Sequence, residues 1–199
     1  MNSTPKMVLL VGSGRDWRMN AHVGPDSTPW LRYAQSYRRA AELLTARVAE
    51  TARDQDFLIF PVAFCWRHYI ELTLKDLIQS CALLLNEPRP APTSHRLSAL
   101  WDHLQPLLVK VWAAAGASLA FADLHPLVNV VQELDRIDSQ STAFRYPEDT
   151  KGGKSLRGIT HINYDTLTEH LTAAGFVLDG LQGCVFEFRS WKQDMQSNW

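Results

Sequence analysis

The sequence predicts an all-α protein, a bundle of about four to six helices with a long loop before the last helix and a non-helical N-terminal arm. Apolar residues recur at three- and four-residue steps in several segments, and Gly/Pro clusters separate those segments. Few segments show the alternation of apolar and polar residues that is typical of half-buried β-strands. A chain of 199 residues with 46% hydrophobic residues can bury one continuous core. We therefore expect an arm over residues 1–29 and a single domain over 30–199.

The first predicted helix covers residues 30–50, after the cluster "GPDSTP". The second covers residues 54–85, with Asp54 or Asp56 as its N-cap. Pro61 fits this helix only within the first turn, because proline removes a helical hydrogen bond further in.

The third predicted helix covers residues 94–115, and Thr93 or Ser94 can cap it. Pro106 should kink or break this helix, and Gly116 is a plausible terminator. A fourth helical element covers residues 121–138.

Residues 139–165 read as a long loop with a short hairpin, because they combine Gly-Gly, one proline and β-branched residues. The final predicted helix covers 165–195, with Asp165 as its cap. Its glycines, Gly175, Gly180 and Gly183, mark weak points or sites of close packing.

Composition excludes several classes of function. Twenty basic and 21 acidic residues give a formal charge of -1, so no overall field draws the chain to nucleic acid or to an anionic membrane. The apolar run "MVLLV" near the N-terminus is too short for a signal peptide or a membrane span. Three cysteines in apolar surroundings, Cys65, Cys81 and Cys184, suggest buried thiols in a reducing compartment, and we expect a cytoplasmic protein without membrane contact.

The second helix carries a polar row within an apolar segment, "FCWRHYIELTLKDLIQS". Arg67, Glu71 and Lys75 step by four residues, so they share one edge of the helix, opposite the apolar arc, and His68 lies beside them. One interpretation is a salt-bridge ladder on a solvated surface. The other is that Glu71 holds the two cations in a cleft, where they bind a phosphate.

Several segments occur in an order that resembles the HEPN superfamily over roughly residues 56–188. The segments are "ELTLKDLI", the proline-containing loop "NEPRPAPTS", the helix start "HRLSALW", the later "FRYPED" and a final amphipathic helix. The resemblance implies a compact, often dimeric helical bundle from prokaryotic toxin-antitoxin, anti-phage or stress systems. Many HEPN proteins are metal-independent endoribonucleases with an Arg-x(4–6)-His signature.

That signature occurs three times, as Arg15 to His22, Arg89 to His95 and Arg96 to His103, but not after Arg136 or Arg145, where the resemblance would place it. The catalytic candidates are therefore Arg67, His68, His95 and Arg145, with Arg96 and His103 as the alternative pair. Glu71, Lys75 and Tyr146 are candidate binding residues.

Two classes of function remain open from the sequence. The first is a HEPN-like protein that binds or cleaves RNA as a homodimer, with Trp191 and Trp199 at an oligomer contact. The second is a catalytically silent scaffold or regulatory subunit that binds a protein partner or a nucleotide. No cofactor or metal is expected, because "VGSGRDW" lacks the glycines of a nucleotide loop and the histidines lack metal-ligand spacing.

Overall fold

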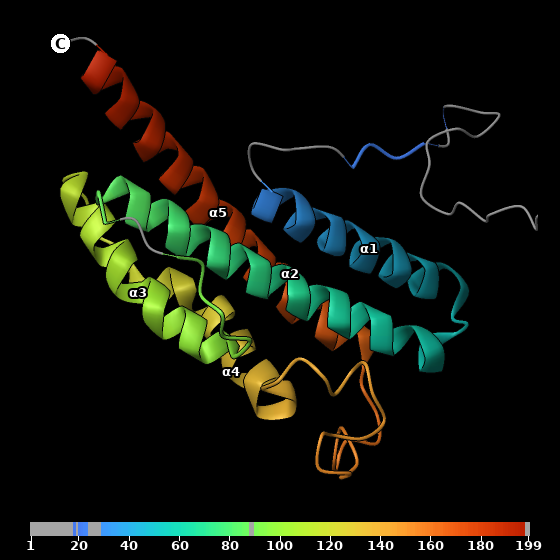
Figure 1. Ribbon diagram of the computed structural model, residues 1–199. Coiled ribbons are helices and arrows are strands. Elements are labelled where there is room, and N and C mark those ends of the chain that lie inside the picture. Colours follow the sequence, from blue (N-terminus) through green and yellow to red (C-terminus); the bar gives the residue numbers. More distant parts are fainter. Residues whose placement is uncertain (1–17, 19, 24–28, 88–89, 198–199) are drawn as a thin grey trace, which may run out of the picture.

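The computed structural model describes residues 18, 20–23, 29–87 and 90–197, and within these ranges it contains five α-helices, one 3-10 helix and no strand. Figure 1 shows the helices packed as a bundle. Their bounds are α1 Pro29–Thr51, α2 Gln55–Leu84, α3 Leu97–Ala114, η2 Phe121–Leu124, α4 His125–Asp138 and α5 Tyr164–Ser197. The predicted all-α bundle is confirmed. The predicted arm lies mostly outside the described residues.

Helix α2 is the centre of the bundle. In Figure 1, α1 runs along one side of α2 and α3 along another, and α5 packs against both α2 and α4. Helix α5 follows α2 from start to end, because Tyr164 donates its hydroxyl to the carbonyl of Gln55 and Lys192 donates to the carbonyl of Leu84. The apolar arc predicted for α2 lies in the core, where Trp66, Tyr69 and Ile70 are almost fully buried.

Both prolines that were expected to limit helices lie inside them. Pro61 is the seventh residue of α2, beyond its first turn, and Pro106 lies within α3 without ending it. The prediction that Pro61 fits only the first turn was wrong, and so was the expectation that Pro106 could break α3. The carbonyls that each proline leaves without a helical donor belong to Phe57 and Asp102, and both residues are exposed, so water can bind them.

Two helix caps also differ from the prediction. Neither Thr93 nor Ser94 caps α3; the side chain of Asp135 on α4 accepts hydrogen bonds from the backbone of Leu97 and Ser98 at 2.9 and 2.8 Å. Helix α5 is capped by Asn163 rather than Asp165, because Oδ1 of Asn163 accepts the backbone N–H of Thr166. Gly116 does follow the end of α3, with φ at +72°.

The loop before α5 spans residues 139–163 and holds a miniature hairpin. Glu148 and Lys154 form an antiparallel bridge, and the backbone N–H of Asp149 donates to the carbonyl of Gly153 at 2.7 Å. Oδ1 of Asp149 accepts two further backbone N–H groups, so the turn has a defined shape.

Two helical segments are long and apolar enough to cross a membrane by length and composition alone, Gln55–Leu84 and Tyr164–Met195. The core helix of a soluble protein passes the same test, and 61% of the 18-residue apolar window in α2 is buried inside the bundle. The corresponding window in α5 is 33% buried. Figure 1 shows the C-terminal part of α5 extending beyond the other helices.

Candidate functional site

The polar row on α2 is buried. Arg67 is 0%, Glu71 1% and Lys75 5% exposed, so the solvated-ladder interpretation and the placement of the row on an outward face were both wrong. The cause is the central position of α2: the segment before α3 and the end of α4 cover the edge that the apolar arc leaves open.

Arg67 joins three parts of the chain. Its Nε donates to the backbone carbonyl of Asp138 at 3.0 Å, and its Nη2 donates to the backbone carbonyl of His95 at 2.8 Å. Its Nη1 donates to Oε2 of Glu71 at 3.2 Å. The planar guanidinium therefore fixes the end of α4 and the start of α3 against α2, as a buried cation must be hydrogen-bonded.

Glu71 accepts hydrogen bonds from two further residues of this network. Its Oε1 accepts a hydrogen bond from Nζ of Lys75 and one from Nδ1 of His95, both at 2.9 Å. Burial acts to raise the pKa of Glu71, but the hydrogen bonds from Lys75 and His95 outweigh it and hold that pKa below its ordinary value. Glu71 is therefore ionised at neutral pH.

Two acidic residues on α4 complete the network, and the sequence reasoning missed both. Oδ1 of Asp135 lies 3.9 Å from Nη2 of Arg67, and Oδ2 of Asp138 lies 3.9 Å from its Nε. Asp138 also accepts the backbone N–H groups of Thr142 and Ala143 on Oδ1. A signal was present: Asp138 follows Leu134 by one helical turn, so it continues the apolar face of α4.

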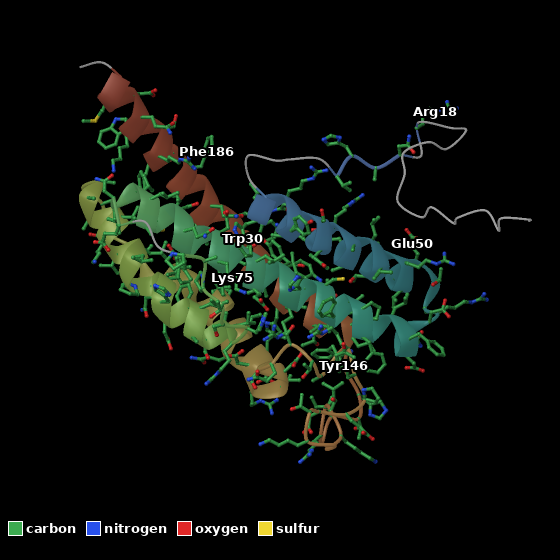
Figure 2. All side chains as sticks on the ribbon, viewed as in Figure 1. Arg18, Trp30, Glu50, Lys75, Tyr146 and Phe186 are labelled. Carbon is green, nitrogen blue, oxygen red and sulfur yellow. The ribbon has the colours of Figure 1, made fainter. Side chains whose placement is uncertain are left out.

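A second cluster lies on the surface beside this network. The imidazole of His68 contacts the ring of Tyr37 edge-on, with centroids 4.4 Å apart, and stacks on Phe64 at 5.5 Å. The guanidinium of Arg145 lies 5.4 Å from the ring centroids of Phe64 and Tyr146. We call His68, Phe64, Arg145 and Tyr146 the surface cluster; Figure 2 shows Tyr146 where the loop meets the bundle.

The members of the surface cluster differ in how far solvent or a ligand can contact their side chains. Tyr146 is 55% exposed and Arg145 is exposed, whereas His68 is half-buried. Burial, with the charges of Lys75, Arg67 and Arg145, lowers the pKa of His68, although Glu71 opposes this shift. The imidazole of His68 is therefore neutral at pH 7 and can accept a proton.

The structure brings most of the sequence candidates into one region. His95 is exposed, and both its imidazole and its carbonyl contact the buried network. Arg145 donates its Nε to the carbonyl of Ser141, just after Asp138. The alternative pair lies on another element: Arg96 is exposed at the N-cap of α3, and His103 is half-buried two turns further along. Arg15 and Arg89 lie outside the described residues.

A second ion pair stabilises the opposite side of α2, and the sequence analysis did not identify it. Nη1 of Arg38 donates to both carboxylate oxygens of Asp179, at 2.7 and 2.6 Å, which joins α1 to α5. Tyr69 donates its hydroxyl to Asp179 at 3.4 Å. Burial and the Asp179 carboxylate raise the pKa of Tyr69 to about 12. This pair has a structural role between three helices.

The fold and site define a class of protein, an all-α bundle whose buried ionic network lies beside the exposed Arg145 and Tyr146 and the half-buried His68. Among the described residues no group of three or more His, Cys, Asp or Glu side chains could hold a metal ion. Comparisons with protein-family models, curated proteins and solved structures find no match to this chain.

Proposed function

We propose that this chain is a HEPN-like protein that binds RNA at the surface cluster and, if it cleaves RNA, does so without a metal ion. In this proposal it acts in the cytoplasm, as a homodimer, in a bacterial defence, stress or toxin-antitoxin system. Two kinds of evidence support the proposal. One is the order of HEPN-like segments along the chain, and the other is the chemistry of the residues that the fold brings together.

The observation that carries the proposal is that Arg145 lies between Tyr146 and the ring of Phe64, which stacks on His68. An exposed tyrosine ring can stack on an unpaired base, and an exposed guanidinium can bind a phosphate through two hydrogen bonds. A neutral imidazole can accept the proton of a 2′-hydroxyl. These contacts suit the recognition of single-stranded RNA and the activation of its 2′-hydroxyl.

The buried residues have a different role in this proposal. Arg67 is 0% exposed and its hydrogen bonds go to the protein, so it cannot contact a phosphate in this conformation. Arg67, Glu71 and Lys75 are positioning residues, which fix His95 and the turn that carries Arg145. His95 is the exposed end of the network and can contact RNA directly.

Binding of a fluorescently labelled, unstructured RNA tests the proposal. The double variant Arg145→Ala, Tyr146→Ala should weaken binding at least tenfold, because it removes the phosphate and stacking contacts. Arg39→Ala is the matched control, because Arg39 is an exposed arginine on α1 that pairs with Glu42 rather than with a residue of the surface cluster. Equal affinity of the double variant and the wild type, or no RNA binding by the wild type, would contradict RNA binding at this site.

Cleavage is tested separately, with a structured RNA in the presence of EDTA. If the protein is catalytic, His68→Ala and His95→Ala should each reduce cleavage, whereas Arg39→Ala should not. A wild type that binds RNA and leaves it intact would retain the binding proposal and exclude the ribonuclease.

A catalytically silent scaffold or regulatory subunit is the second candidate, and the surface of α5 favours it. Phe176, Phe186 and Trp191 are 66%, 73% and 57% exposed, and Figure 2 shows Phe186 on the side of α5. Exposed aromatic residues of this kind are typical of protein interfaces. Light scattering of the purified chain tests self-association: a monomer that binds no RNA would favour a regulatory subunit that needs a different protein partner.

A further inference from the structure

An apolar hollow of about 590 Å³ lies where the ends of α2 and α3 meet the C-terminal part of α5. Figure 1 shows α5 extending beyond the other helices at this end of the bundle. The apolar residues of its lining include Leu84, Val111, Phe188, Trp191 and Met195. Among the described residues of the lining, Lys192 is the one that carries a charge. Trp191 and Met195 are 57% and 51% exposed, so a ligand can reach the hollow.

A smaller hollow of about 140 Å³ adjoins the first, and both Leu84 and Lys192 line the two. The rest of its lining includes Asn86, Gln193 and the exposed Arg189. Neither lining contains an acidic residue among the residues that the structure describes, so the two hollows together carry the positive charges of Lys192 and Arg189. An apolar hollow and a cationic one therefore lie side by side, with Lys192 between them.

The ammonium group of Lys192 is half-buried and has no carboxylate partner within the described part of the chain. Its Nζ donates to the backbone carbonyl of Leu84 at 2.6 Å and to Oδ1 of Asn86 at 2.9 Å, and both acceptors are uncharged. The first contact caps the end of α2, which is a common role for lysine. An ammonium group has three donors, so one N–H remains. An anion beside Lys192 would supply both the missing acceptor and the counter-charge.

We propose that the two hollows bind a medium-chain fatty acid. The carboxylate would accept a hydrogen bond from Nζ of Lys192 and lie near Arg189, and the alkyl tail would lie along Phe188, Trp191 and Met195. These three residues lie within two turns of α5, about 10 Å along its axis, which suits a tail of medium length. Positive charge without an acidic residue favours a carboxylate over an amine on the same tail.

The size and the position of the larger hollow agree with a separate small-molecule site. Its volume is within the range of about 300 to 1,000 Å³ that is typical of such sites, which combine an apolar lining with a few polar groups. Leu84 lies at the end of α2, roughly 24 Å along the helix axis from His68 of the surface cluster. The proposal therefore goes beyond RNA binding and does not depend on it.

Isothermal titration at neutral pH and about 0.15 M salt tests the proposal with octanoate, and with octylamine, 1-octanol and acetate as separate arms. Octylamine has the same tail with the opposite charge, 1-octanol has the tail without a charge, and acetate has the carboxylate alone. Octanoate should bind with one site per chain and at least tenfold more tightly than octylamine or acetate. Equal affinity for octylamine would overturn the assignment of a carboxylate, and so would the absence of saturable octanoate binding.

Variants locate the site. Lys192→Met removes the charge and keeps an unbranched apolar stem, so it should weaken octanoate binding at least tenfold and leave 1-octanol binding unchanged. Equal loss of both ligands would contradict the ionic contact.

Ala114→Trp should weaken the binding of both octanoate and 1-octanol, because Ala114 is exposed on the lining and an indole ring there would fill the hollow. Unchanged affinity for both would place the ligand elsewhere and overturn the proposal. Lys151→Met is the matched control, since Lys151 is an exposed lysine of the loop 139–163 and lines neither hollow. Circular dichroism checks that each variant folds.

Discussion

The carboxylate of Glu71, which is 1% exposed, lies 2.9 Å from Nδ1 of His95, whose side chain is 62% exposed. A carboxylate can only accept, so Nδ1 of His95 carries the proton in this contact. The bond connects the interior of α2 to a surface residue just before α3. It makes His95 the point at which the buried network reaches solvent.

Because Glu71 has a lowered pKa in the folded chain, it stabilises the fold above the ordinary glutamate value of about 4.3. That stabilisation should decrease as pH falls through the lower, folded pKa. Urea unfolding of wild type and Glu71→Gln between pH 7 and pH 3 measures it. The difference in unfolding free energy between the two should be largest near neutral pH and should shrink in acid. A difference that stays constant across this range would contradict the role assigned to Glu71.

Removal of Arg67 should be strongly destabilising. Arg67→Ala leaves the carbonyls of His95 and Asp138 without their donor and removes one charge from a buried ion pair, which typically costs about 3 to 5 kcal/mol. Arg39→Ala, on the exposed face of α1, should change stability little. Chemical denaturation of both variants provides the comparison. If Arg67→Ala unfolded at the same urea concentration as wild type, the network would have no structural role.

Gly180 and Gly183 occupy the middle of α5, and a Cβ at either position meets nothing within 4 Å. Gly180→Ala and Gly183→Ala should therefore each stabilise the isolated chain by about 0.5 to 1 kcal/mol, because glycine disfavours helix interiors. Gly175→Ala is the control with neighbours, since its Cβ would contact Trp66 at 3.6 Å. Thermal unfolding at several protein concentrations measures the effect. Destabilisation that depends on concentration would instead indicate that a second copy covers these glycines.

The three cysteines should differ in reactivity. Cys65 and Cys81 are buried. Burial raises the pKa of the Cys65 thiol above its ordinary value and raises the pKa of the Cys81 thiol to about 12, so both thiols stay protonated at pH 8. Cys184 is exposed, so the expectation that all three thiols are buried was wrong for it. Iodoacetamide should label one cysteine per native chain and three per denatured chain, and mass spectrometry should place the native label on Cys184. Native labelling of Cys81 would contradict its burial.

Local sequence patterns predicted most of the helices. The apolar periodicity of α1 and α2 depends only on the helical repeat, so the expected segment 30–50 corresponds closely to Pro29–Thr51. Gly116 ends α3 for a local reason as well, since its positive φ suits glycine. The caps of α3 could not be predicted in this way. Asp135 reaches Leu97 and Ser98 from another helix, nearly forty residues along the chain.

In the candidate site, too, some features could be predicted from local spacing and others depend on contacts between distant segments. The four-residue spacing of Arg67, Glu71 and Lys75 already implied that their side chains pair with one another, and the structure contains both pairs. Asp138 was missed, because one turn of spacing beyond Leu134 does not reveal that a cation from α2 will face it. The contact of Arg145 with Phe64 likewise joins residues from distant segments.

The sequence alone determined that the chain is an all-α bundle, where most of its helices lie, and that α2 carries a charged row. These properties follow from spacing within single helices, which is a local matter. The tertiary structure decided that the row is buried, that α4 caps α3, and that the carboxylate of Asp138 lies beside Arg67. Each of these depends on which surfaces the other helices cover, and burial is a property of the packed chain rather than of any one segment.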